Sequence, residues 1–181
     1  MYSAKLQRAA RAIRQGGVVA YATEYCFGFG CDPHHYAAVL RLLRLKQRPV
    51  KKGLIVLAAD VDQLAPYVEE IPPAVRASWP GPHTWLLTPR PGVPGWITGG
   101  HDKIAVRVTA HPQAAALCKA AGMAIISTSA NRAGDRPVRT DREAMRRFGK
   151  RMDVVLPGRV GQARAPTPIR DAATGSLIRP G

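Results

Sequence analysis

The sequence predicts an α/β domain, with an α+β-like order of elements, built on a mixed β-sheet. Short apolar segments of strand length alternate with segments whose apolar residues repeat at helical spacing. The alternation is not strict, because the strands predicted at His83 to Thr88 and Ile104 to Val108 have no helix between them. A chain of 181 residues is long enough to bury a core. We therefore expect one domain over residues 1–181.

Two helices and a buried strand are predicted at the start of the chain. Ser3 can cap a helix whose apolar residues follow a helical period and which ends at Gly16-Gly17. Val18 to Tyr21 is then a short buried strand, and a loop that contains Gly28-Phe29-Gly30 follows it. A second helix is expected from about Pro33 to Lys46.

The rest of the chain continues the alternation without an internal repeat. In chain order, the predicted elements are a strand at Leu54 to Ala58, short helices at Asp60 to Tyr67 and Pro73 to Trp79, the strand His83 to Thr88, a Pro/Gly-rich loop from Pro89 to Gly100, the strand Ile104 to Val108, a helix at His111 to Ala121, a strand at Ala124 to Ser127, a helix at Asp141 to Gly149, and late strands at Val154-Val155 and Ser176 to Ile178.

Composition places the chain among soluble globular proteins, with 46% hydrophobic and 22% charged residues. We expect a cytoplasmic location, because the N-terminus lacks the apolar region of a secretory signal and no apolar run is long enough for a membrane span. Cys26, Cys31 and Cys118 form no CxxC pair, which predicts free thiols and no structural zinc.

The formal net charge of +15 is the unusual bulk property, and twenty of the 27 basic residues are arginine. Such a charge attracts nucleotides, nucleic acids or acidic surfaces. An arginine-rich composition is also typical of genomes with a high GC content. Charge alone therefore does not choose among these partners.

Several kinds of catalytic site are missing from the sequence. It has no GxxxxGK[ST] phosphate loop and no GxSxG nucleophile motif, and Gly28-Phe29-Gly30 lacks the third glycine of a dinucleotide-binding motif. Acidic residues are too sparse for a convincing pair of catalytic carboxylates.

Cationic and hydroxyl residues instead follow the predicted helices and strands. Pro49 disfavours a helical Arg48, so Lys46 and Arg48 could reach the same anion; a solvated helix end is the alternative. Ser127 to Asn131 follows a buried strand, where it could bind a ligand or form an ordinary polar turn. Arg107 lies on an apolar strand and is either exposed or paired with an anion, for which no nearby acid is an obvious candidate. Together these groups describe a cationic, hydroxyl-lined cleft for an anionic ligand such as a nucleotide.

The order of these motifs over essentially the whole chain resembles the YrdC/TsaC family, and the KxR and SxN motifs together are quite specific. The segments that carry the resemblance are Gly16 to Glu24, Phe27 to Pro33, Leu45 to Pro49, Lys52 to Ile55, Trp79 to Thr84, Ala105 to Val108, Ser127 to Asn131, Pro157-Gly158, Thr167 to Asp171 and Ile178 to Gly181.

This resemblance implies a twisted open sheet around a deep basic cavity. It also implies a nucleotidyltransferase reaction, in which L-threonine, bicarbonate and ATP give threonylcarbamoyl-AMP and pyrophosphate for the t6A37 modification of tRNA. The protein partners would be those that transfer the threonylcarbamoyl group to tRNA. Mg²⁺ would come with ATP, held by phosphates more than by protein.

The family also suggests roles for individual residues. Lys46 and Arg48 would be catalytic and hold the phosphates, while Arg107 would bind the threonine carboxylate or bicarbonate. The other substrate-binding residues would be Thr23, Ser127 and Thr167, and the other nucleotide-binding residues would be Ser129, Asn131 and Arg179. Ala22, Tyr25 and Phe27 depart from the family pattern, and Tyr25 changes the shape expected for the amino-acid pocket.

Two other functions are compatible with the sequence. The first is binding of tRNA or double-stranded RNA, which the net charge favours but the low aromatic content of 6% does not. The second is a relative of the hydrogenase maturation proteins that use carbamoyl phosphate, in which the same domain is fused to others. We expect the synthase instead, because this chain has nothing before or after the domain.

Overall fold

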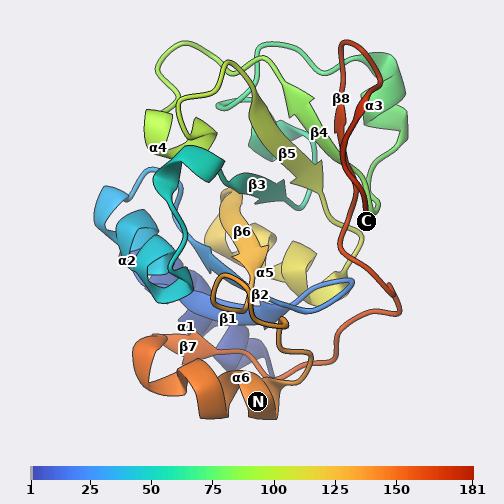
Figure 1. The fold of residues 1–181 in the computed structure, drawn as a ribbon. Helices are drawn as coiled ribbons and strands as arrows, with labels where there is room; N and C mark the ends of the chain where they lie inside the picture. The colour runs from blue at the N-terminus through green and yellow to red at the C-terminus, as the bar shows by residue number, and fades with distance from the viewer. Residues whose placement is uncertain (1) are drawn as a thin grey trace.

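The computed structural model describes residues 2–181, which form an α/β fold around one nine-stranded sheet (Figure 1). The strand order is β7-β1-β2-β6-β3-β5-β4-β8-β9. The strands are β1 (Val19–Ala22), β2 (Phe27–Cys31), β3 (Ile55–Ala58), β4 (Thr84–Leu87), β5 (Ile104–Val108), β6 (Ile125–Ser129), β7 (Val154–Val155), β8 (Ile169–Asp171) and β9 (Leu177–Arg179).

The sheet is mixed, which confirms the predicted fold class. The pairs β1–β7, β3–β5 and β4–β8 are parallel, whereas the other neighbouring strands are antiparallel. The α-helices are α1 (Tyr2–Arg14), α2 (Tyr36–Lys46), α3 (Pro73–Ala77), α4 (Gly95–Thr98), α5 (Pro112–Ala121) and α6 (Asp141–Phe148), and 3₁₀ turns lie at Val50–Lys52, Asp62–Leu64 and Gly149–Arg151.

Apolar side chains cover both faces of the sheet. On one face, Ile13 of α1 and Leu117 of α5 share a buried cluster with Tyr21 and Leu57 of the strands. On the opposite face, α2 and α6 contribute to a larger cluster, in which the rings of Phe29 and Phe148 meet edge to face. Each of α1, α2 and α5 buries its apolar residues against the sheet.

The segment Gly28-Phe29-Gly30 is the main difference from the predicted elements. The sequence places it in a loop, but it forms the central part of β2. Tyr21 on β1 lies against both glycines: a Cβ atom at Gly30 would lie 2.9 Å from the Tyr21 ring, and one at Gly28 would lie 3.4 Å from it. Glycine in this strand therefore makes room for a tyrosine ring, as glycine often does inside a sheet.

The other differences are smaller. Ser3 lies inside α1 rather than capping it, and α2 begins at Tyr36 with His35 as its cap. The segment expected as a helix at Asp60 to Tyr67 holds only a 3₁₀ turn, and the loop Pro89 to Gly100 contains the short helix α4. Strand β8 was not predicted; it pairs with β4 and so brings the C-terminal segment onto the sheet.

Candidate functional site

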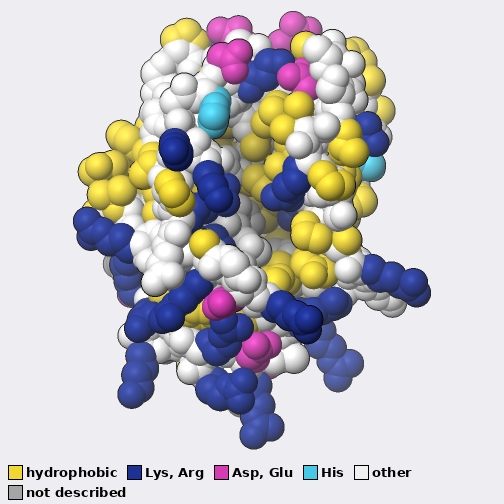
Figure 2. All heavy atoms as spheres, viewed as in Figure 1, with side chains coloured by type: hydrophobic (Ala, Val, Ile, Leu, Met, Phe, Trp, Pro, Cys, Tyr) yellow, Lys and Arg dark blue, Asp and Glu magenta, His cyan; other side chains and the backbone are white. Residues whose placement is uncertain are grey.

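A pocket of about 750 Å³ opens on the face of the sheet that α1 and α5 cover only in part. Ile55 and Leu57 are two residues apart on β3 and point to the same face. Leu57 is buried in the cluster beneath α1 and α5, whereas Ile55 lines the pocket together with its cross-strand neighbours Ala105 and Ser127. The strands therefore form the floor of the pocket where the helices end. Figure 2 shows the pocket as a hollow with Lys and Arg side chains on its walls.

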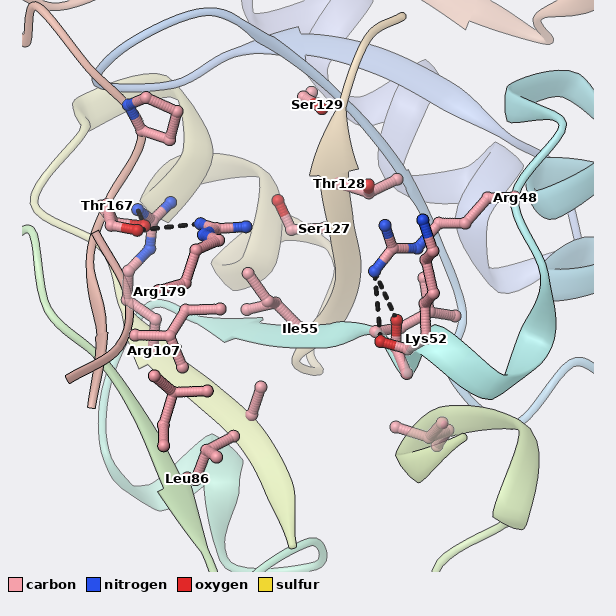
Figure 3. A pocket seen from close by; sticks show the side chains of 18 of the residues that line it. Arg48, Lys52, Ile55, Leu86, Arg107, Ser127, Thr128, Ser129, Thr167 and Arg179 are labelled. Carbon is pink, nitrogen blue, oxygen red and sulfur yellow. Dashed lines mark hydrogen bonds between the residues drawn. The ribbon is translucent and has the colours of Figure 1, made fainter. Parts of the chain in front are cut away.

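Three arginines reach the pocket from three separate parts of the chain: Arg48 follows α2, Arg107 lies on β5 and Arg179 lies on β9. Figure 3 shows Arg107 and Arg179 together beside Thr167, while Arg48 lies across the pocket from them beyond Ile55. An anionic ligand in this pocket would therefore meet guanidinium groups on opposite sides.

Arg107 is buried, with 7% of its surface exposed, so the interpretation of this residue as exposed is wrong. Its Nη2 forms an ion pair with Oε2 of Glu24 at 3.1 Å, and its Nη1 donates a hydrogen bond to Oγ1 of Thr167 at 3.1 Å. Its Nε is buried and has no hydrogen-bond partner in the described part of the chain. The acid that pairs with it lies in the loop between β1 and β2, far away in sequence, which is why sequence spacing did not reveal it.

The turn after α2 determines where Arg48 points. Gln47 ends the helix in the left-handed conformation, with φ of 52°, and the backbone N–H of Arg48 donates to the carbonyl of Leu43 at 3.0 Å. Arg48 thereby leaves the helix, as predicted from the proline after it. Its Nη2 donates to the carbonyls of Lys52 and Gly53 at 3.2 and 3.0 Å, and its Nε finds no hydrogen-bond partner within the described residues. Burial and the positive charge of Arg179 lower the pKa of Arg48.

The C-terminal segment supplies Thr167 and Arg179, as the family resemblance implied. Arg179 Nη2 donates to the backbone carbonyl of Thr167 at 2.8 Å, while the hydroxyl of Thr167 accepts the bond from Arg107. Thr167 thus connects two arginines, and burial together with the charge of Arg107 lowers the pKa of Arg179. A bound anion would reduce the repulsion between these two guanidinium groups.

Thr23 and Ser127 also bring hydroxyl groups to the site, and both residues line the pocket. Ser127 Oγ accepts a hydrogen bond from the buried hydroxyl of Tyr21 at 2.7 Å, and Thr23 Oγ1 donates to the carbonyl of Cys26 at 2.7 Å. Because the Tyr21 ring lies over the glycines of β2, its hydroxyl can reach across that strand to Ser127 on β6. The glycines of β2, which the sequence analysis placed in a loop, therefore help to hold Ser127 in place.

Lys46 is placed differently from the prediction that it shares an anion with Arg48. Its side chain is buried and is not among the residues that line the pocket. Its Nζ donates to the backbone carbonyl of Ser129 and, at 2.9 Å, to that of Asn131. The reversal of the chain at Gln47 turns Lys46 and Arg48 in different directions. Lys46 therefore supports the loop that carries Ser129 and Asn131, which both line the pocket.

Burial and, to a smaller extent, the charge of Arg48 together lower the pKa of Lys46 to about 8. Ser129 Oγ donates to Asn131 Oδ1 at 2.6 Å, and Asn131 Nδ2 donates to two carbonyls of the following turn. The Ser129–Asn131 loop is therefore held to α2 by the ammonium of Lys46 and to the following turn by the amide of Asn131.

The sequence reasoning missed several pocket residues. Glu24 pairs with Arg107, and Lys52 lies beside Arg48 at the pocket wall. Tyr25, expected to alter the pocket, does line it, and Arg139 lies over its ring at 5.2 Å. The sequence offered one indication of a role for Glu24, which is that it directly follows Thr23, a predicted site residue. It did not indicate which of the many basic residues would pair with Glu24.

Metal and thiol chemistry find little support in residues 2–181. No group of three or more His, Cys, Asp or Glu side chains in this part of the chain could hold a metal ion. Cys26, Cys31 and Cys118 are free and buried, as predicted. Burial raises the pKa of the Cys26 thiol, the one at the pocket, to about 11, so it is protonated at neutral pH. No helix in the described residues is long and apolar enough to cross a membrane.

Comparisons with known proteins identify the family that this chain resembles. A family model for Sua5/YciO/YrdC proteins, described as telomere recombination, matches residues 11–181. A protein of Halorhodospira halophila named threonylcarbamoyl-AMP synthase is 51% identical over 179 residues, which cover 97% of this chain and 94% of that protein. A protein of Methylococcus capsulatus with the same name is 53% identical, with coverage of 97% and 96%.

Solved structures share the fold. Sua5 of P. abyssi, solved in complex with L-threonine, is 32% identical with a TM-score of 0.90. The match covers 97% of this chain but 54% of that protein, so this chain spans about half the length of P. abyssi Sua5. YciO of E. coli is 25% identical with a TM-score of 0.85, over 100% of this chain and 90% of YciO. HypF of T. kodakarensis, at 21% identity and a TM-score of 0.83, shows the fold alone.

Proposed function

The chain belongs to the Sua5/YciO/YrdC family, and from this membership we propose that it is a threonylcarbamoyl-AMP synthase. Its substrates are ATP, L-threonine and bicarbonate, and its products are threonylcarbamoyl-AMP and pyrophosphate. The observation that carries the proposal is a pocket lined by three arginines, several hydroxyl side chains and the Ser129–Asn131 loop, in a chain about half identical to enzymes of that name.

The reaction consists of two bond-forming steps. The amine of L-threonine attacks the carbon of bicarbonate, and loss of water leaves N-carboxythreonine. An oxygen of this new carboxylate attacks the α-phosphorus of ATP, and the bond to the leaving pyrophosphate breaks. The protein needs no nucleophile of its own for these steps, because positioning and charge neutralisation provide most of the catalysis of such transfers. The absence of a catalytic triad from the sequence is consistent with this chemistry.

Charge explains why the pocket needs several arginines. The three substrates together carry roughly six negative charges, which repel one another strongly when water is excluded. In our proposal Arg48 holds the phosphates and stabilises the developing charge, and Arg107 binds the threonine carboxylate or bicarbonate. Thr23, Ser127 and Thr167 seat the amino acid, and Ser129, Asn131 and Arg179 contact the nucleotide. The placement of all eight side chains along one pocket supports these roles.

We assign Lys46 an indirect role in catalysis. Its ammonium holds the carbonyls of Ser129 and Asn131, and its charge adds to the positive potential beneath the phosphates. Mg²⁺ enters with ATP as part of the substrate. Of the pocket carboxylates, Glu24 and Asp171 pair with Arg107 and Lys103, and no group of three or more His, Cys, Asp or Glu side chains within residues 2–181 could hold a metal ion.

Pyrophosphate release from the purified protein tests the proposed function. With ATP, Mg²⁺ and bicarbonate, we expect release only when L-threonine is also present, and a product with the mass of threonylcarbamoyl-AMP. Omitting bicarbonate from degassed buffer should stop it. Replacing bicarbonate and threonine with carbamoyl phosphate tests the hydrogenase-maturation alternative. Pyrophosphate formed only with carbamoyl phosphate would overturn the synthase assignment.

In this proposal the enzyme acts in the cytoplasm, and its product is the substrate of a further reaction there. A threonylcarbamoyl-transfer protein receives threonylcarbamoyl-AMP and modifies adenosine 37 of tRNA. Addition of such a protein and of unmodified tRNA to the reaction should convert the product to t6A and release AMP.

Weak binding of tRNA or double-stranded RNA is a second candidate activity. The observation in its favour is a group of exposed cations on and around α6, at the lower end of the face in Figure 2. Its members are Arg132, Arg136, Arg139, Arg142, Arg146, Lys150 and Arg151. RNA affinity should fall steeply with salt and should survive Arg48→Ala, whereas pyrophosphate release should not survive that substitution.

A further inference from the structure

Arg107 has an acidic neighbour, Glu24, to which the proposed reaction assigns no role. Within residues 2–181, Glu24 is the acid that forms an ion pair with one of the three pocket arginines. Its side chain is 14% exposed and that of Arg107 is 8% exposed, so the pair is largely shielded from water. Screening by solvent is weak at such a site, and the interaction is stronger than at a surface ion pair.

Glu24 is itself held by two independent groups. Its Oε1 accepts a hydrogen bond of 2.6 Å from Thr109 Oγ1. Its backbone carbonyl accepts a hydrogen bond from Ala163, and a Cβ atom at Gly161 would lie only 2.8 Å from that same carbonyl oxygen. Burial alone would raise the pKa of the Glu24 carboxyl, but the charge of Arg107 and the hydroxyl of Thr109 outweigh it and hold the pKa below its ordinary value. The carboxylate is therefore charged and fixed in position at neutral pH.

Two contacts from different segments fix the plane of the Arg107 guanidinium. Glu24 holds Nη2 from the loop after β1, and Thr167 holds Nη1 from the C-terminal segment. Figure 3 shows the group between Thr167 and Ser127, where it faces the pocket. A guanidinium fixed in this way can bind a planar anion without first losing rotational freedom.

Glu24 also balances charge on this side of the pocket. Arg179 lies close enough to Arg107 for the two charges to interact, and both are linked to Thr167. Without the carboxylate, the two guanidinium groups would repel each other in the empty pocket and Arg107 would turn away. Glu24 thus keeps Arg107 in place before any substrate binds.

We propose that Glu24 is a positioning residue for the amino-acid side of the reaction, acting through Arg107 on a bound carboxylate or bicarbonate. This inference rests on the proposed synthase function. It makes Thr109, Glu24 and Arg107 a chain in which the first residue orients the second and the second orients the third.

Glu24→Gln is the decisive substitution, because glutamine keeps the size of the side chain and an acceptor for Thr109 but removes the charge. We expect the KM for L-threonine, or for bicarbonate if that is the anion Arg107 binds, to rise about ten- to a hundredfold, as expected when a charged hydrogen bond is lost. The KM for ATP should change little. Thr109→Val, which loosens Glu24 but keeps its charge, should raise the same KM by a smaller factor.

Two comparisons test whether Glu24 acts on the substrate through Arg107. Glu143→Gln makes the same chemical change at a surface carboxylate that also pairs with an arginine, and it should leave every KM unchanged. In an Arg107→Gln background, Glu24→Gln should cause no further loss of affinity for L-threonine in calorimetric titrations. A further loss there would mean that Glu24 contacts the substrate directly, and would overturn the inference.

The outcomes also distinguish this inference from the proposed function. If the wild-type protein releases pyrophosphate with threonine and bicarbonate but Glu24→Gln and Thr109→Val leave all KM values unchanged, the function stands and the role of Glu24 is wrong. If the wild-type protein neither turns over nor binds L-threonine, the proposed function fails and this inference fails with it.

Discussion

Arg48 connects the backbone of its own loop to the interior of the pocket. Its Nη2 donates to two carbonyls, while its Nε has no hydrogen-bond partner among residues 2–181. We predict that Arg48→Ala lowers kcat/KM for pyrophosphate release about a hundredfold or more, in the range seen when one charge-stabilising donor is removed. Arg48→Lys should recover part of this loss, because lysine restores the charge but not the planar fork. Near-normal turnover by Arg48→Ala would refute its role on the phosphates.

Lys46 predicts a dependence of activity on pH. Because its pKa is lowered to about 8, the free enzyme loses the ammonium above that pH, and the charged hydrogen bonds to Ser129 and Asn131 weaken. We expect kcat/KM to fall as pH rises through about 8. Bound phosphates favour the ammonium, so the corresponding fall in kcat should occur at higher pH.

Lys46→Arg is the control, since arginine stays charged throughout this range. Ionisations of threonine and bicarbonate affect both proteins equally and cancel in the ratio of wild-type to Lys46→Arg activity. This ratio should decline above pH 8. A ratio that does not vary with pH would assign the decline to another group.

At the residue scale, the sequence predicted which side chains gather but not all of their contacts. Thr23, Arg48, Arg107 and Ser127 lie along one pocket because each follows or belongs to a strand or helix whose position the pattern predicted. Thr167 precedes β8, which was not predicted, and was expected only from the family resemblance. Burial of Arg107 required Glu24, which is distant in sequence. Lys46 and Arg48 point in different directions because Gln47 between them has a left-handed conformation. The sequence does not predict this conformation, because it has no glycine at that position.

At the scale of elements, β2 shows why secondary structure was only partly predictable. Two glycines in five residues are typical of a loop, and nothing local indicates that Tyr21 needs the space they leave. β8 is three residues long and exists only because it pairs with β4 and β9. Helix α5 was predicted to within a residue, because its own sequence defines it.

The close contact between Gly30 of β2 and Tyr21 leads us to predict a loss of stability when a methyl group is added at Gly30. In Gly30→Ala, the new Cβ would lie 2.9 Å from the Tyr21 ring and 3.0 Å from the carbonyl of Ile126. We expect a loss of about 1–3 kcal/mol in the free energy of unfolding, as for other overpacked cores. Turnover should also fall, because displacement of Tyr21 frees Ser127. Urea unfolding measures the first effect.

Gly95→Ala provides the comparison for this prediction. No atom lies within 4 Å of a Cβ at Gly95, and its backbone is not left-handed. Its effect on stability should stay within about 0.5 kcal/mol. Equal effects at the two positions would mean that the close contact with Tyr21 relaxes without cost.

At the scale of the whole molecule, one sheet joins two buried clusters that lie on its opposite faces. We propose on this basis that residues 1–181 form a single domain. Neither cluster can lose its packing without exposing strands that the other cluster also covers. Calorimetry should therefore show one transition whose calorimetric and van't Hoff enthalpies agree. Two separate transitions would divide the chain into independent units.

The net charge of +15 predicts how stability responds to salt. Like charges repel in the folded protein more than in the expanded unfolded chain, and salt screens this repulsion. The midpoint of thermal unfolding should therefore rise as NaCl increases from about 0.02 to about 0.3 M, because the Debye length shortens over this range.

A double substitution on α6 tests whether repulsion is the cause. Arg142 and Arg146 are exposed, and Arg142→Glu with Arg146→Glu lowers the net charge by four. Arg142 lies in the first turn of the helix and Arg146 in its second half, so the effects of the new acids on the helix dipole should largely cancel. The variant should unfold at a higher temperature than the wild type in low salt and respond less to added NaCl. A wild-type midpoint that falls with salt would show instead that ion pairs such as Arg41–Asp153 outweigh the repulsion.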